Sequence, residues 1–221
     1  MLKKIWDVLW RRIMALGSPR DIIRKIGHRR YIGGKWDEIG KLQFDFMTGR
    51  GLKPEHVLLD IACGPLRGGV HFIRYLNRGN YLGIEKEEDL IRAGIDKELG
   101  RKLFEEKSPE LVTSGTFEFN GFSKHPQFAI AHAIFTHLTP ADIELCLNHL
   151  RAVVEKDCRF YATFFESPSE MNHAALSRDY EIFKYTRMQM NAFGEKCGWR
   201  PVYIGEWNHP RGQMMMEYTA I

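Results

Sequence analysis

The 221-residue sequence has no long uninterrupted apolar run. A membrane-spanning helix needs about 18 consecutive, predominantly apolar residues, and no stretch of this chain reaches that length. Near the N-terminus, Lys3-Lys4 precede several apolar residues, but Asp7 and Arg11-Arg12 interrupt them and no small-residue cleavage site follows. We therefore expect no transmembrane segment and no signal peptide, and a cytoplasmic location.

Cysteines are few, and their spacing along the sequence is not that of a metal-binding site. The four cysteines lie far apart in apolar surroundings, without a C-x-x-C pair: Cys63, Cys146, Cys158 and Cys197. Such thiols are typical of the core of a protein in a reducing compartment, whereas a disulfide framework or a zinc site needs closer spacing. Redox chemistry is not expected.

The charge is weak and spread along the chain. The net charge is +4, with 32 basic and 28 acidic residues, and no segment concentrates basic residues with interleaved aromatics. Repeats and low-complexity segments are absent as well. Hydrophobic content of 44% and charged content of 27% are ordinary for a folded globular domain, so a nucleic-acid partner is not expected.

A strand, a glycine-rich turn and a helix are predicted between residues 57 and 76. The apolar run Val57–Ile61 contains one carboxylate, Asp60, and leads into a turn that ends at Gly68-Gly69. In open α/β sheets, ligands bind beyond the carboxyl ends of the strands, where glycines let backbone amides approach them. The turn therefore predicts a nucleotide-like ligand, but it lacks the G-x-G-x-x-G spacing of a dinucleotide site.

A second short apolar strand, residues 81–85, ends in Glu85, 25 positions after Asp60. A carboxylate that ends the second strand of a βαβ unit is placed to accept hydrogen bonds from both hydroxyls of a ribose.

These two features resemble the class I S-adenosylmethionine-dependent methyltransferases, with a lead-in at residues 31–36 like that of a bacterial branch. Their first motif is an acidic residue that ends strand one, followed by alternating glycines; here Ala62 and Leu66-Arg67 replace two of those glycines. The resemblance implies an α/β fold: a Rossmann-like, seven-stranded, mostly parallel sheet with helices on both faces and an antiparallel last strand over residues 51–221. An N-terminal helical extension and lid would occupy residues 1–50.

The resemblance implies S-adenosylmethionine as the cofactor and a set of candidate residues around it. The candidates in the lid would fold over the donor, and those after the first three strands would line its amino acid, ribose and adenine. They are Tyr31, Gly34, Trp36, Gln43, Asp60, Ala62, Cys63, Gly64, Leu66, Arg67, Glu85, Lys86, Thr116, Phe117 and His132.

Two histidines follow the predicted fourth strand, residues 128–131, which the family places beside the reactive methyl group. A histidine with a pKa of about 6.5 can take a proton from an acceptor hydroxyl near neutral pH. His132 and His137 are therefore the candidate catalytic residues, with a structural hydrogen-bonding role as the alternative. Tyr31, Trp36 and Phe135 are candidates for presenting aromatic faces to a cationic donor.

Further elements are expected from periodicity and from turn residues. We expect a helix at 20–26 that is capped by Ser18, one helix at 87–99, a third strand at 111–119 and a last helix at 180–197. Residues 206–213 are expected to form a turn built from Pro210 and Gly212 or, alternatively, to contribute to the acceptor pocket. Residues 2–16 predict an amphipathic helix that caps the domain or, alternatively, contacts a membrane surface or a partner.

The expected activity is metal-independent methyl transfer, because Ala129 and Ala131 stand where a metal-dependent relative would carry an aspartate. The expected acceptor is a hydroxyl oxygen of a small molecule, such as a sugar or a specialised metabolite. A protein or RNA methyltransferase and a non-catalytic binding module are the alternatives. A monomer or a homodimer is expected.

Overall fold

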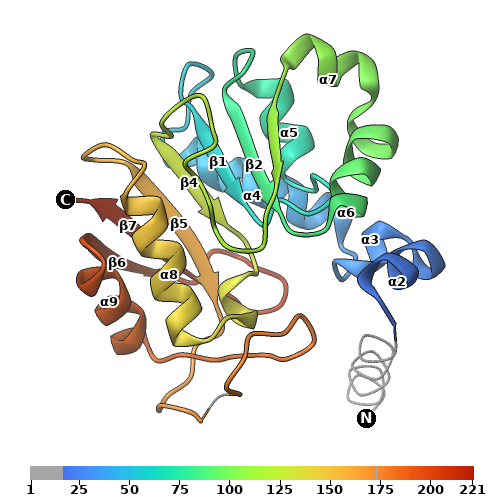
Figure 1. The fold of residues 1–221 in the computed structure, drawn as a ribbon. Coiled ribbons are helices and arrows are strands. Elements are labelled where there is room, and N and C mark those ends of the chain that lie inside the picture. The colour runs from blue at the N-terminus through green and yellow to red at the C-terminus, as the bar shows by residue number, and fades with distance from the viewer. Residues whose placement is uncertain (1–16, 173) are drawn as a thin grey trace.

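The computed structural model describes residues 17–172 and 174–221 and has a seven-stranded sheet at its centre (Figure 1). The strand order is β3-β2-β1-β4-β5-β7-β6. The strands are β1 (Leu58–Ile61), β2 (Tyr81–Glu85), β3 (Glu110–Thr113), β4 (Phe128–Ala131), β5 (Arg159–Phe164), β6 (Trp199–Gly205) and β7 (Met214–Ala220).

The sheet is parallel except at one strand. β1 pairs in parallel with β2 and β4, β3 with β2, and β5 with β4, whereas β7 runs antiparallel to both β5 and β6. The predicted mostly parallel sheet with an antiparallel last strand is confirmed. The connections reverse direction between β1 and β4, which is the switch point where open α/β sheets bind ligands.

Helices cover both faces of the sheet (Figure 1). Alternate strand residues point to opposite faces: Leu59 and Ile61 join a core beneath α8 and α9, whereas Leu58 joins a second core beneath α4 and α5. The helices are α2 (Pro19–Ile26), α3 (His28–Tyr31), α4 (Trp36–Gly49), α5 (Gly69–Tyr75), α6 (Glu88–Ala93), the π-helix η1 (Gly94–Leu99), α7 (Arg101–Lys107), the 3-10 helix η2 (Phe135–His137), α8 (Pro140–Arg151) and α9 (Arg187–Lys196).

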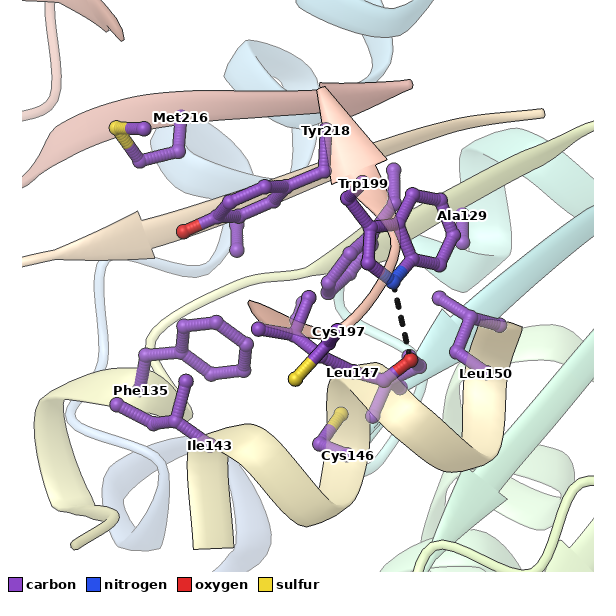
Figure 2. Close-up of a cluster of buried hydrophobic side chains, with 14 of the residues drawn as sticks. Ala129, Phe135, Ile143, Cys146, Leu147, Leu150, Cys197, Trp199, Met216 and Tyr218 are labelled. Carbon is purple, nitrogen blue, oxygen red and sulfur yellow. Dashed lines mark hydrogen bonds between the residues drawn. The ribbon is translucent and has the colours of Figure 1, made fainter. Parts of the chain in front are cut away.

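The core under α8 and α9 is built from large aromatic and aliphatic side chains (Figure 2). Trp199 is fully buried, and its indole N–H donates to the Leu147 carbonyl at 3.1 Å. Phe135 lies in this core, packed against Phe160, so the expectation that it presents a face to a ligand is wrong. All four cysteines are free and buried, as predicted for core thiols.

Three predicted elements end or begin elsewhere. β3 stops at Thr113 rather than at residue 119, because the chain turns at Ser114, whose N–H donates to the Glu85 carbonyl. α9 begins only at Arg187 rather than at residue 180, and Thr186 and Gln189 form a capping box at its start. Residues 180–186 have no helical structure.

The predicted helix at 87–99 is divided into α6 and η1, and α7 was not predicted at all. The division falls at Gly94, where a Cβ atom would lie 2.8 Å from the Pro65 backbone. α2 starts as expected, with the Ser18 side chain accepting from the Asp21 N–H. The amphipathic helix predicted at 2–16 lies outside the described residues. Within residues 17–172 and 174–221, no helix is long and apolar enough to cross a membrane.

Candidate functional site

The turn after β1 has a backbone path typical of glycine, although two of its positive-φ residues, Ala62 and Leu66, are not glycine. Ala62, Gly64 and Leu66 all have positive φ angles, of 57°, 55° and 64°. This left-handed conformation costs an L-residue about 1–2 kcal/mol, so other contacts must hold the two non-glycine residues there. Leu66 is fully buried, and its side chain packs where a Cβ on Gly94 would lie. The replacements therefore alter the side chains of the turn but not its backbone course.

Replacing Ala62 with glycine is expected to raise the free energy of unfolding by about 0.5–1 kcal/mol, because glycine tolerates the positive φ angle. The urea midpoint measures this change. Ala129→Gly is the matched control, since Ala129 lies in β4 with ordinary strand geometry and glycine there should destabilise. Equal destabilisation of both variants would contradict the strain at Ala62.

Glu85 lies buried at the carboxyl end of β2 and holds the turn in place. Its Oε2 accepts the Gly64 N–H and its Oε1 accepts the Glu87 N–H, both at 3.0 Å. Burial raises its pKa, and the two backbone N–H groups act against that rise. A carboxylate has about four lone-pair sites, so each oxygen can still accept a further hydrogen bond.

Asp60 lies next to this turn and is almost completely buried. Burial raises its pKa to about 7; the hydroxyl of Tyr81, which donates to its Oδ2 at 2.7 Å, acts in the opposite direction. Burial likewise raises the pKa of the Cys63 thiol well above its usual value, so this thiol stays protonated at neutral pH. The end of β1 and the following turn therefore hold one carboxyl group that titrates near neutrality and one unreactive thiol.

The raised pKa of Asp60 makes stability depend on pH. Between pH values of about 4 and 7 the folded protein keeps a proton that the unfolded chain releases, so the free energy of unfolding falls by up to roughly 4 kcal/mol as the pH rises through this range. Asp60→Asn keeps an acceptor for Tyr81 but cannot titrate. Its urea midpoint should depend less on pH than that of the wild type, and parallel pH curves would contradict a raised pKa.

The segment before β1, which is predicted to form the lid, contacts the turn mainly through its backbone groups. The Arg67 guanidinium donates to the carbonyls of Gly34, at 3.0 Å, and Ile32. Tyr31 is half-buried, and its hydroxyl oxygen lacks a hydrogen-bond partner. Burial raises the pKa of that hydroxyl, and the nearby carboxylates of Asp179, Glu87 and Glu85 raise it further.

Two other residues of the predicted lid, Trp36 and Gln43, make packing contacts within the protein. The Trp36 ring meets the edge of His28, and the Arg29 guanidinium lies 4.7 Å above the Trp36 centroid. Arg29 and His28 both bind Glu98 of η1, which fixes α3 to the domain. Gln43 is buried on α4, where its side chain lies against Gly68.

A cavity of about 190 Å³ lies beside Lys86, between the lid and the segment after β5. Its lining residues are Pro19, Ile22, Tyr31, Lys86, Arg178, Asp179 and Tyr180. Lys86, which directly follows β2, forms an ion pair of 2.6 Å with Asp179 of the segment after β5. The turn that carries Thr116 and Phe117 approaches from the other side: a Cβ on Gly115 would lie 3.6 Å from the Lys86 Cβ.

His137 has a defined tautomer. Its Nδ1 lies 2.6 Å from the Glu181 carbonyl oxygen, which can only accept, so Nδ1 carries the proton and Nε2 keeps its lone pair in the neutral ring. Burial lowers its pKa. The imidazole is therefore neutral at physiological pH and able to take a proton at Nε2.

His132 belongs to a basic cluster that gathers at the end of β4. Arg67 donates to His132 Nδ1 at 3.3 Å, and His132 Nε2 lies 3.2 Å from Nε2 of His209. Trp207 stacks on His209, with the ring planes 11° apart. The Arg211 side chain, from the same β6–β7 loop, donates to the Gly33 carbonyl of the lid. We call Arg67, His132, His209 and Arg211 the basic cluster.

Several of these contacts lie outside the residues predicted from sequence. The loop at 206–213 contains the turn expected at Pro210 and Gly212, where the Gly212 N–H donates to the His209 carbonyl, and it also brings buried Trp207 and His209 to the end of β4. Asp179 also closes over Lys86 from a distant segment. Within the described ranges, 17–172 and 174–221, no group of three or more histidine, cysteine or acidic side chains is arranged to hold a metal ion.

No protein-family model matches the sequence. Solved structures match the fold. One is magnesium protoporphyrin IX methyltransferase from Synechocystis PCC 6803 with bound S-adenosylmethionine: TM-score 0.60, 12% identity, covering 96% of this chain and 89% of that one. The chain has the class I methyltransferase fold.

Two further solved structures show the same likeness. CalS10 from Micromonospora echinaspora, an amino pentose methyltransferase of calicheamicin biosynthesis solved with bound S-adenosylmethionine, gives a TM-score of 0.62 at 13% identity over 86% of this chain and 93% of that one. DesVI from Streptomyces venezuelae gives a TM-score of 0.64 at 15% identity, and the match covers 86% of this chain and 95% of that one. At these identities the likeness is one of fold, and it confirms the predicted seven-stranded architecture.

Proposed function

We propose that this protein is an S-adenosylmethionine-dependent methyltransferase that methylates a hydroxyl oxygen of a small molecule, a sugar or a specialised metabolite. The observation that carries the proposal is the buried Glu85 carboxylate at the end of β2. One of its oxygens accepts the Gly64 N–H of the turn after β1 and the other accepts the Glu87 N–H after β2, and the remaining lone-pair sites are available to two ribose hydroxyls.

The residues present fit this donor. A buried polar atom without a hydrogen-bond partner, the Tyr31 hydroxyl oxygen, lies in the segment before β1. Buried polar atoms are nearly always paired in native proteins, so a ligand that supplies its partner is favoured there. Bound S-adenosylmethionine supplies a methyl group on a sulfonium, which an aligned nucleophile can displace.

In this proposal His137 is the general base. Its Nε2 lone pair takes the proton of the acceptor hydroxyl as the new oxygen–carbon bond forms, and its Nδ1–H keeps the ring oriented through the Glu181 carbonyl. No metal ion is required by this step. The four reduced, buried cysteines support a cytoplasmic location.

The acceptor class is tested by fractionation. The protein is incubated with methyl-labelled S-adenosylmethionine and, separately, with the small-molecule, protein and RNA fractions of a cell extract, with and without EDTA. Label should enter the small-molecule fraction and should not depend on EDTA. Label in protein or RNA would overturn the acceptor class, and label in no fraction would favour a non-catalytic module.

The role of His137 is tested by His137→Asn, which should lower kcat by about 100-fold or more while leaving donor affinity unchanged. His125→Asn is the matched control, because the exposed His125 also has Nδ1 next to a backbone carbonyl, that of Val153. Equal activity of the two variants would exclude His137 as the base.

A further inference from the structure

The basic cluster contains more positive charge than the described residues neutralise. Neither Arg67 nor Arg211 forms an ion pair with a carboxylate within residues 17–172 and 174–221. Arg67 is only 8% exposed and its Nε has no hydrogen-bond partner. A buried guanidinium normally pairs with an anion, because leaving a charge unpaired away from water is costly.

The charges around the cluster include few acids. Arg67 and Arg211 lower the pKa values of both His132 and His209, the latter to about 4, after the larger effect of burial. The opposing groups are Asp60, which acts on Arg67, and Glu38, which acts on His209. Asp60 is itself half-protonated near pH 7, and Glu38 is already paired with Lys35. Positive potential therefore dominates.

The hydrogen-bond pattern of the two histidines leaves two donors facing each other. His132 Nδ1 faces an arginine, which can only donate, and His209 Nδ1 accepts the Gln213 N–H at 3.3 Å. Each neutral ring must therefore carry its proton on Nε2. The two Nε2 atoms lie 3.2 Å apart, so two N–H groups meet with no acceptor between them.

An oxygen atom with negative charge would resolve this conflict. It would accept from both Nε2–H groups after a small separation of the rings, and the two arginines would neutralise its charge. A water molecule could accept these bonds too, but it would leave the arginines without a counter-charge. The cluster therefore favours an oxyanion.

The position of the cluster points to the methyl acceptor rather than to the donor. Glu85 lies on the β2 side of β1, whereas His132 follows β4 on the other side of β1 in the sheet order. His209 and Arg211 belong to the β6–β7 loop, and His209 contacts His132 at the carboxyl end of β4. Ligands that meet at the switch point occupy its two sides, so the β4 side is open to the second reactant.

We infer that the basic cluster binds a carboxylate or phosphate group carried by the methyl acceptor, so that the substrates of this protein are acidic small molecules. The inference rests on the proposed function, because it assumes that the β2 side holds the donor. It assigns His132 to acceptor binding, and leaves His137 as the base.

The test uses inorganic phosphate as the probe and the ¹⁵N signals of the histidine rings as the readout. The full-length protein is first saturated with S-adenosylhomocysteine, and phosphate or acetate is then titrated; His132→Asn and His209→Asn assign the signals. Both ring signals should shift with phosphate or acetate at millimolar concentration. Arg211→Gln should weaken this binding at least fivefold, because it removes one of the two arginine charges of the cluster. Arg211 is exposed, so the variant should still fold.

Arg101→Gln, on α7, removes the same charge far from the cluster and should change nothing. A parallel titration replaces S-adenosylhomocysteine with 5′-methylthioadenosine, which lacks the amino acid part of the donor. Phosphate binding to both complexes supports an acceptor site. Binding only in the 5′-methylthioadenosine complex would assign the cluster to the donor carboxylate and overturn the inference, as would no binding in either complex. If S-adenosylhomocysteine itself does not bind, the proposed function fails, whereas phosphate titrated into the free protein still reports on the cluster.

Discussion

Replacing Glu85 with glutamine is expected to weaken S-adenosylmethionine binding by at least tenfold, which is about 1.4 kcal/mol or more. Both carboxylate oxygens already accept backbone N–H groups, from Gly64 and Glu87. Glutamine has only one acceptor oxygen, so its NH₂ group must face one of these N–H donors or turn away. The variant therefore loses an acceptor for ribose and also loosens the turn after β1.

Calorimetric titration of the donor measures the change, and thermal unfolding shows whether the variant remains folded. Glu88→Gln is the matched control: it removes the same charge three residues along, where the exposed Glu88 pairs with Arg92 on α6. The control should bind like the wild type. Unchanged binding by folded Glu85→Gln would remove the assignment of Glu85 to the ribose.

Replacing Gly40 with alanine is expected to lower the free energy of unfolding by about 1–3 kcal/mol and to weaken donor binding severalfold. α4 crosses the turn after β1 so closely at Gly40 that a Cβ atom would lie 2.5 Å from the Arg67 carbonyl oxygen. That oxygen belongs to the backbone and cannot swing aside as a side chain would. The helix must move outward, and with it the contact between Gln43 and Gly68.

Gly49→Ala gives a direct control within the same helix. A Cβ on Gly49, the last residue of α4, would contact nothing within 4 Å. Alanine there should be neutral, or should stabilise by up to about 1 kcal/mol through helix propensity. Urea unfolding compares the two variants. A Gly40→Ala protein as stable as Gly49→Ala would show that the close crossing of α4 is absent.

The strand–turn–helix unit and the carboxylate at residue 85 could be predicted because their signals are local. An apolar run of strand length, a glycine-rich turn and a following helical pattern lie within twenty residues of one another. The positive φ angles at Ala62 and Leu66 could not be predicted, because those residue types disfavour them; burial of Leu66 and its contacts with neighbouring glycines hold the backbone there.

The contacts that form the basic cluster could not be predicted, for a different reason, although Arg67 and His132 were themselves candidate site residues. His132 meets His209, which lies 77 positions later, and Lys86 meets Asp179 across 93 positions. Such contacts depend on how strand order and loop paths bring distant segments together. The periodicity of the sequence predicts local elements but not which distant segments meet. The late start of α9 has a similar origin, since Phe183 and Tyr185 are buried and their N–H groups bond to the distant Thr136 and Phe165 carbonyls rather than to a helix.

The central claim is that the edge of the sheet at β1 and β2 binds S-adenosylmethionine. Isothermal titration of S-adenosylmethionine and S-adenosylhomocysteine into the wild-type protein tests it most directly. The account predicts saturable binding of both compounds at one site per chain, with competition between them. Absence of heat and of thermal stabilisation with either compound would contradict the account, because the fold would then be present without the donor site.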